Sequence, residues 1–255
     1  PEEADTYTVG GVFRPQGEFG GVLDGLIVTV DYYKIEIDDL IDELGGFEIA
    51  SNCVDAQTLN NQFCDAIDRD PTNGFITDFR SGFINLAAVE TAGVDWRVDY
   101  SMGVPEFLGG SEFGRLSFSS GGTRFLTNDE TRDVSAPDEI TDVLGELSRP
   151  EWIVNLNANW SWNKIGLGWH GRFESSQRAT GVDNDDVQNN PDFANIINTD
   201  SSVVHDFTAS YFFTDRIEFY GGINNAFDEE PFIGALTRPT GPRGRFFFAG
   251  LNLTL

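Results

Sequence analysis

The residues that could carry out chemistry are few and scattered in this sequence. His170 and His205 are the only histidines, and neither has the clustered partners that a metal site or a general base requires. The segment Asp183-Asn184-Asp185-Asp186 lacks the spaced ligands and terminal Glu of a calcium loop, which leaves a loosely bound cation as the alternative. There is no Gly-x-Ser-x-Gly motif. We therefore expect no catalytic residue, no resident metal and no cofactor.

The two cysteines, Cys53 and Cys64, lie in a polar stretch without metal-ligand spacing. An even pair of this kind fits a disulfide formed in an oxidising compartment such as the periplasm, and two free thiols are the alternative. The charge balance is 42 acidic against 16 basic residues, a net charge of −26. Phosphate backbones would be repelled, so we expect no nucleic-acid partner. The acid excess fits solubility or a saline habitat, or else cation attraction at a pore mouth.

The elements that position these residues are strands. In Trp152–Trp162 the even positions are apolar and nearly all odd positions are Asn or Ser, and the alternation resumes at Ile165 after Asn163-Lys164. Period two is typical of half-buried strands, and a two-residue connection predicts a hairpin. The same alternation predicts strands at Ile84–Val104, Trp152–Trp162, Ile165–Glu174, Val203–Phe213, Ile217–Phe227 and Phe247–Leu255. Less regular patterns predict three more, at Thr6–Arg14, Leu26–Ile37 and Arg115–Leu126, which makes nine strands.

The connections alternate between short ones, near 15–25, 105–112, 163–164 and 214–216, and long ones, near 38–80, 128–149, 180–201 and 228–243. Short periplasmic turns and long external loops are typical of transmembrane β-barrels. No apolar run is long enough for a membrane-spanning helix. We therefore expect an all-β, antiparallel transmembrane barrel; a soluble sandwich with Trp in its core is the alternative.

Each face of the predicted strands then has a role. The apolar face would meet lipid, with interfacial aromatics at Trp96, Tyr100, Trp152, Trp160, Trp162, Trp169, Phe207, Tyr211, Phe213 and Phe219. The polar face would meet the lumen or a plug, or be a generic wet lining; its candidates are Asp95, Arg97, Asp99, Asn155, Asn157, Asn159, His170, Arg172, Glu174 and Asp206. Nine antiparallel strands leave the first and last parallel, so further strands must close the barrel. We expect an N-terminal part outside residues 1–255, and the first residues resemble no signal peptide.

Several segments, in order along the chain, resemble TonB-dependent receptors. These are the Pro-Glu…Tyr…Gly stretch at 1–10, Val30-Asp31-Tyr32-Tyr33, Asn85-Leu86-Ala87 with Gly93-Val94-Asp95, Asn224-Asn225-Ala226-Phe227-Asp228, and Gly241-Pro242-Arg243-Gly244-Arg245 before the last strand. The cysteine loop with Arg69-Asp70-Pro71 resembles one branch of that family. The resemblance implies the last nine strands of a 22-stranded barrel in the Gram-negative outer membrane. It places a plug domain and a TonB box outside this chain.

The resemblance also implies partners: TonB, ExbB and ExbD through the plug, the barrel-assembly machinery, and outer-membrane lipid. The last strand would serve barrel insertion through Phe247, Leu251, Leu253 and Leu255, although family members usually end in an aromatic residue and this chain ends in Leu255. The expected function is active, TonB-energised uptake of a large scarce nutrient: a siderophore, cobalamin or an oligosaccharide. The rivals are a passive porin-type channel and a soluble β-sandwich binding module such as a lectin, with an outer-membrane enzyme last.

Overall fold

The computed structural model describes residues 2–15, 23–43, 45–56, 58–131, 140–178, 199–232, 240 and 243–254. The chain divides into two compact units, which we describe separately. The first comprises Pro1–Tyr7, Lys34–Thr91 and Thr127–Asp142, and the second comprises Thr8–Tyr33, Ala92–Leu126 and Val143–Leu255.

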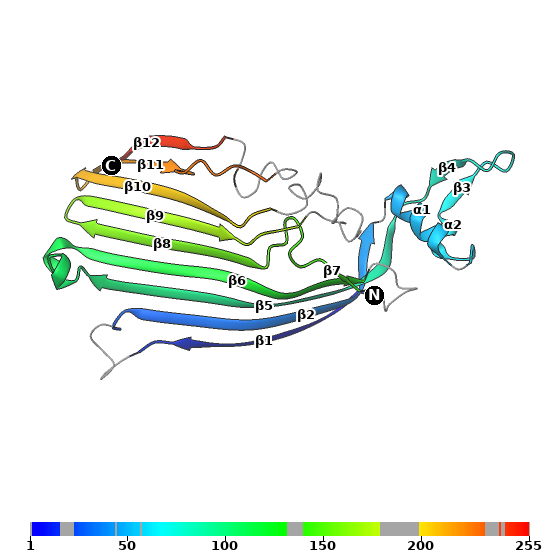
Figure 1. The fold of residues 1–255 in the computed structure, drawn as a ribbon, viewed down its shortest axis with the longest axis horizontal. Helices are drawn as coiled ribbons and strands as arrows, with labels where there is room; N and C mark the ends of the chain where they lie inside the picture. Colours follow the sequence, from blue (N-terminus) through cyan, green and yellow to red (C-terminus); the bar gives the residue numbers. More distant parts are fainter. Residues whose placement is uncertain are drawn as a thin grey trace. The chain divides into compact units, whose positions relative to one another are not determined.

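Nine strands pair side by side in chain order (Figure 1). They are β1 (Glu3–Phe13), β2 (Leu26–Glu43), β5 (Phe83–Gly103), β6 (Arg115–Thr131), β8 (Trp152–Trp162), β9 (Ile165–Glu174), β10 (Ser202–Thr214), β11 (Ile217–Asn224) and β12 (Phe246–Leu253). A further short strand, β7 (Thr141–Asp142), pairs with β6. In the described residues the path begins at β1 and ends at β12, so the sheet is open. All nine predicted strands are confirmed.

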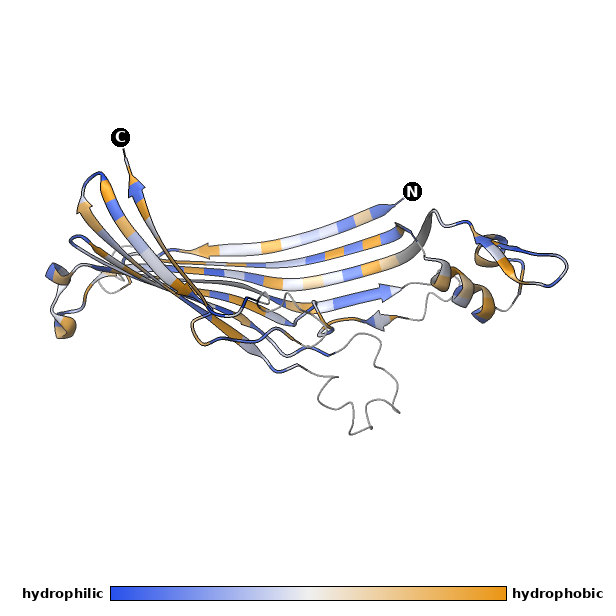
Figure 2. Cartoon of the chain, turned by 90° about the horizontal axis from the view of Figure 1, so that it is seen from above, coloured by the Kyte–Doolittle hydropathy of each residue, from blue (hydrophilic) through white to orange (hydrophobic). Residues whose placement is uncertain are grey.

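The second unit holds most of the regular sheet. Its strands alternate hydrophilic and hydrophobic residues along their length (Figure 2), which is the pattern of a sheet with two different faces. Asn163 and Lys164 connect β8 to β9 as predicted, because Trp162 pairs directly with Ile165. Asn163 has a positive φ of 49°, a conformation that Asn tolerates in two-residue hairpins. The β8–β9 and β10–β11 hairpins and the connection between β5 and β6 lie at the same end of the sheet (Figure 1).

The first unit contains a small folded subdomain between β2 and β5, where the sequence predicts only a long connection. Helix α1 (Gly46–Asp55) and the short α2 (Gln62–Asp65) precede a hairpin of β3 (Ile67–Arg69) and β4 (Ile76–Phe79). We call residues 46–79 the disulfide subdomain, because Cys53 and Cys64 are bonded across it with Cα atoms 4.7 Å apart. This confirms the predicted disulfide.

The interior of the disulfide subdomain explains why the chain folds there. Cys53 is 5% exposed and lies in one apolar cluster with Ile49, Phe63 and Ile67. Asn61 caps α2, since its side-chain oxygen accepts hydrogen bonds from the Phe63 and Cys64 amides, both at 2.9 Å. The cluster is small, so a covalent bond across it has a large share in its stability.

The turn between β3 and β4 is ordered by Asp70. Its Oδ1 accepts a hydrogen bond of 2.7 Å from the Thr72 amide, and this bond to the ionised form lowers the pKa of the Asp70 carboxyl. Gly74 completes the turn at a φ of 75°, which glycine adopts without a steric penalty.

Some strand ends differ from the sequence-based expectation. β2 continues to Glu43 and β6 to Thr131, beyond the predicted ends at 37 and 126, because polar and acidic residues such as Asp38, Asp39 and Asp129 replace the apolar alternation there. β11 ends at Asn224, so Phe227 lies in the following turn. Neither helix of the described residues is long and apolar enough to cross a membrane.

Candidate functional site

The polar face of the sheet gathers the predicted lumen or plug residues. The strand registers place Asn155, Asn157 and Asn159 of β8 on one face with His170, Arg172 and Glu174 of β9 and Asp206 of β10. Asp95 joins them through a hydrogen bond with Thr123, and Arg97 and Asp99 follow Asp95 with period two. We call this face the polar wall. All ten predicted residues belong to it; its contact with a lumen or a plug stays a prediction.

One cross-strand row runs across four strands of the polar wall. Ser119, Asn157, His170 and Asp206 stand directly opposite one another in turn. The Asn157 side-chain amide donates to Ser119 Oγ at 3.2 Å, and His170 Nδ1 lies 3.4 Å from Asp206 Oδ2. Such a row offers hydrogen-bond donors and acceptors at strand spacing, which suits binding of a polar partner.

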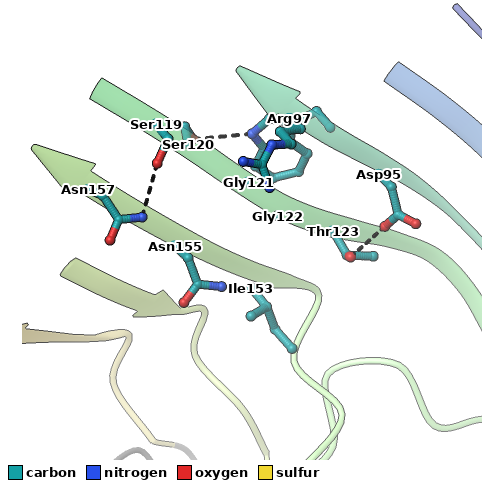
Figure 3. A pocket seen from close by; sticks show the side chains of 11 residues that line it. Asp95, Arg97, Ser119, Ser120, Gly121, Gly122, Thr123, Ile153, Asn155 and Asn157 are labelled. Carbon is teal, nitrogen blue, oxygen red and sulfur yellow. Dashed lines mark hydrogen bonds between the residues drawn. The ribbon is translucent and has the colours of Figure 1, made fainter. Parts of the chain in front are cut away.

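A hollow of about 520 Å³ opens in the polar wall over β5, β6 and β8 (Figure 3). Gly121 and Gly122 lie along its floor, and Asp95, Arg97 and Asn155 line it. Asp95 is held by Thr123 Oγ1 at 2.5 Å, and the Arg97 guanidinium binds Asp99 through two bonds of 2.6 and 3.0 Å. The hollow therefore presents a carboxylate and a guanidinium, and each is held by hydrogen bonds to a neighbouring side chain.

A second hollow of about 260 Å³ lies between β8 and β11, where Gly166 and Gly168 carry no side chain. Thr208, Ser210 and Tyr220 line its other side. Among the described residues, no three His, Cys, Asp or Glu side chains come close enough to hold a metal ion. The geometry of the polar wall is that of a hydrogen-bonding surface.

The residues that sequence reasoning missed on this wall are Ser119 and Thr123 of β6. The alternation of β6 is broken at Gly121-Gly122, which hid the polar positions on either side. On the opposite face the Trp96 ring covers Gly122, since a Cβ there would lie 2.6 Å from it. The glycine is thus required by the Ile153 carbonyl oxygen on β8, which would lie closer still to that Cβ, and by the Trp96 ring on β5. The local pattern reveals neither neighbour.

The opposite, apolar face carries most of the predicted interfacial aromatics. The registers place on it Trp152, Trp160, Trp162, Trp169, Phe207, Tyr211 and Phe219, together with Phe247, Leu251 and Leu253 of the last strand. Trp96 joins them, with its ring 5.8 Å from that of Trp152, and Tyr100 shares its parity on β5. Phe213 falls at an irregularity of the β10–β11 register. Leu255, Asp183 and Asp186 lie outside the described residues.

Polar atoms on the apolar face have partners. The Arg124 guanidinium lies 4.9 Å from the centre of the Trp152 ring and pairs with Glu151 at 3.3 Å. The Trp169 indole donates to His205 Nδ1 at 3.1 Å. An indole N–H needs such an acceptor wherever water is excluded. These polar groups of the apolar face therefore keep their partners in surroundings without water.

A family model described as the TonB-dependent receptor-like β-barrel matches residues 1–226. The chain belongs to this family. It is accordingly a protein of the Gram-negative outer membrane. A comparison with curated proteins gave no significant match.

Solved structures of TonB-dependent receptors share the fold. The ferric enterobactin receptor of Pseudomonas aeruginosa matches with a TM-score of 0.61 and 13% identity, over 99% of this chain and 31% of that one. The siderophore receptor PirA of Acinetobacter baumannii gives 0.56 and 12%, over 100% and 32%. The ferric-catecholate import receptor Fiu of E. coli K12 gives 0.53 and 15%, over 99% and 28%. The chain thus spans about a third of the length of these receptors.

The family motif around Asn225 acts as a clasp at the end of the sheet opposite the hairpins. Asn225 is 4% exposed with a φ of 50°. The Asn225 side chain accepts a hydrogen bond of 2.7 Å from the Glu229 backbone N–H and donates one of 2.8 Å to the Glu229 carbonyl. The backbone N–H of Asn225 donates to Asp206 Oδ1 at 2.7 Å. Asp228 accepts from the Arg245 amide at 2.7 Å. The motif therefore links β10, β11 and the approach to β12.

We expect Asn225→Ala to lower the free energy of unfolding of the receptor by about 2 kcal/mol, because two hydrogen bonds from a buried side chain to the half-buried Glu229 backbone are lost. Urea unfolding followed by tryptophan fluorescence measures this. The neighbouring Asn224 is exposed, so Asn224→Ala is the matched control and should change stability by less than about 0.5 kcal/mol. Equal effects of the two substitutions would contradict the clasp.

Two long connections meet at this same end of the second unit. Residues 145–147 bond to Arg178 through two backbone hydrogen bonds of 2.7 and 2.8 Å, and Ser148 bonds to the Gln177 side chain at 2.7 Å. Val143, Gln177 and Ser202 are almost fully buried. The described parts of these connections, residues 140–150, 175–178 and 199–201, are therefore folded, which the polar composition of 128–149 does not predict.

Proposed function

We propose that this chain is the C-terminal barrel wall of an outer-membrane receptor that takes up a large, scarce nutrient, energised through TonB. The apolar face contacts lipid, and the polar wall lines an interior shared with a plug domain and with further strands of the same protein. The observation that carries the proposal is the two-faced sheet: one face holds charged and amide side chains, and the other holds tryptophan and aliphatic residues.

The dimensions of β8 support contact with a bilayer. Trp152 and Trp162 begin and end this strand of 11 residues. At about 3.3 Å per residue the strand is about 33 Å long, and a tilt of about 40° reduces its height to about 25 Å, the height of the apolar band of outer-membrane barrels. The aromatic residues therefore fall where the two girdles of such a band belong.

The edges of the sheet support further strands. Within the described residues β1 pairs only with β2, and β12 only with β11. Unpaired backbone groups are costly in hydrocarbon, where water cannot bind them. Strands of the same polypeptide that pair with β1 and β12 would close the barrel, as the resemblance to 22-stranded receptors implies.

The composition of the polar wall supports a plug. Asp95, Arg97 and Arg172 present charges of both signs, and a protein surface can pair such charges more completely than a passing solute can. The cargo class we propose is a siderophore, cobalamin or an oligosaccharide, each too large for passive diffusion. The strongly acidic chain slightly disfavours a free anionic ferric chelate among the siderophores.

Conductance of the intact receptor in a planar bilayer bathed in KCl separates a receptor from a porin. A plugged receptor should show no steady conductance, whereas an open channel conducts continuously. Uptake of a labelled ferric catecholate, of cobalamin and of a maltooligosaccharide should then be compared in cells with and without TonB. We expect accumulation of one cargo class that is lost without TonB. Steady conductance together with TonB-independent uptake would overturn the proposal in favour of a passive channel.

A further inference from the structure

The connection between β5 and β6, residues 104–114, is a folded and largely apolar turn. It consists of two 3₁₀ turns, η2 (Glu106–Leu108) and η3 (Ser111–Phe113). Phe107 is 84% exposed and Leu108 is 60% exposed. Residues 104–114 contain two glutamates and no lysine or arginine. Phe107 and Leu108 thus form an adjacent pair of exposed apolar side chains on a turn without a basic residue, and such a patch suits an interaction surface.

The turn is fastened to the apolar face of the sheet. The Trp160 indole donates to the Phe113 carbonyl and the Trp162 indole to the Glu112 carbonyl, both at 2.9 Å. The Phe113 ring also stacks on that of Trp162, with centroids 5.7 Å apart. Both tryptophans project from the apolar face, so the turn folds toward that side and away from the polar wall.

The internal geometry of the turn fixes where Phe107 and Leu108 point. Gly109 ends η2 at a φ of 115°, and the Phe113 ring lies where a Cβ of Gly109 would be. The Gly110 amide donates to the Pro105 carbonyl at 3.0 Å. The two 3₁₀ turns are thus held against each other, and the apolar side chains of η2 are presented by a rigid frame.

We propose that this turn is a membrane anchor: Phe107 and Leu108 insert into the phospholipid leaflet at the periplasmic interface. The inference rests on the proposed function, in which the apolar face contacts lipid. The turn lies at the same end of the sheet as the short hairpins (Figure 1), and short turns mark the periplasmic side of outer-membrane barrels. Trp160 and Trp162 make it continuous with the proposed lipid surface, and aromatic and aliphatic side chains at this depth bind the boundary between headgroups and acyl chains.

Single-site labelling tests the anchor. The described residues contain no free cysteine, because Cys53 and Cys64 are bonded to each other. A bimane label on F107C therefore reports one position within this chain, and any cysteine of the intact receptor outside residues 1–255 is replaced beforehand. Phe107 is 84% exposed, so the label disturbs little packing. The receptor is placed in nanodiscs of phosphatidylcholine with or without bromine in the acyl chains. We expect brominated lipid to reduce the fluorescence by about twofold, as for a side chain at the acyl boundary.

Two control sites separate the inference from the proposed function. Leu167 lies on the apolar face of β9, so a label on L167C should be quenched by brominated lipid as well. Phe75 is exposed at the tip of the disulfide subdomain, so a label on F75C should not be quenched. Quenching at 167 without quenching at 107 overturns the anchor and leaves the proposed function standing. Absence of quenching at both overturns the proposed function, and quenching at both supports each.

Discussion

Replacing Ala209 with arginine should lower the free energy of unfolding of the receptor by about 2–4 kcal/mol, the cost of a cation on the lipid face near the bilayer midplane. Ala209 is exposed near the middle of β10, where it pairs with Leu167 and Gly221 on the apolar face. The measurement is urea unfolding of the receptor in phospholipid vesicles, followed by tryptophan fluorescence.

Two controls make this prediction specific to lipid. Thr208 is the neighbouring residue on the polar face, where it borders a hollow of about 260 Å³; Thr208→Arg should cost less than about 1 kcal/mol because water or a polar partner can bind the guanidinium. Ala209→Leu should also be almost neutral, since lipid yields to a larger side chain. If the apolar face were packed against a second sheet, overpacking would cost about 1–3 kcal/mol, and that cost would contradict lipid contact.

Removing the cystine should destabilise the disulfide subdomain by about 3 kcal/mol, because the bond closes a loop of sequence separation 11. The variant is Cys53→Ala with Cys64→Ala, which keeps the buried positions apolar. Hydrogen–deuterium exchange of peptides from residues 46–79 measures the effect, and it should show much faster exchange in the variant.

The barrel strands provide the internal control for this experiment. Peptides from β8 and β9 belong to the other compact unit and should exchange at the same rate in the variant and the parent protein. Reduction of the parent with dithiothreitol should reproduce the variant. Unchanged protection of residues 46–79 would mean that Ile49, Phe63 and their neighbours hold the subdomain without the covalent bond.

The strands could be predicted because the two faces of the sheet meet different surroundings. Period two in Trp152–Trp162 results from that difference, and the same alternation marks most strands of the path, with interruptions in β2 and β6. In the disulfide subdomain, α2, β3 and β4 escaped prediction because they have only four, three and four residues. Elements that short have no period to detect, and their stability comes from one buried cluster and one covalent bond.

The candidate site followed from the same alternation, with two gaps that have physical causes. Ser119 and Thr123 were hidden where Gly121-Gly122 interrupt the pattern, and Gly122 is required by the Ile153 carbonyl oxygen and the Trp96 ring. Asn225 was recognised only as part of a family motif. Its role depends on Asp206, 19 residues earlier in the chain, and such a contact is fixed by the pairing of β10 with β11 and not by local sequence.

The exposure of the two faces of the sheet to water or to lipid can be measured residue by residue. Spin labels placed singly at positions 154 to 159 of β8, in the receptor in nanodiscs, report collision with oxygen, which concentrates in hydrocarbon, and with a water-soluble nickel chelate. We expect oxygen collision to peak at Val154, Leu156 and Ala158 and to fall at Asn155, Asn157 and Asn159. Oxygen collision that is equally low at all six positions, or that peaks at the asparagines, would contradict a lipid-facing apolar surface.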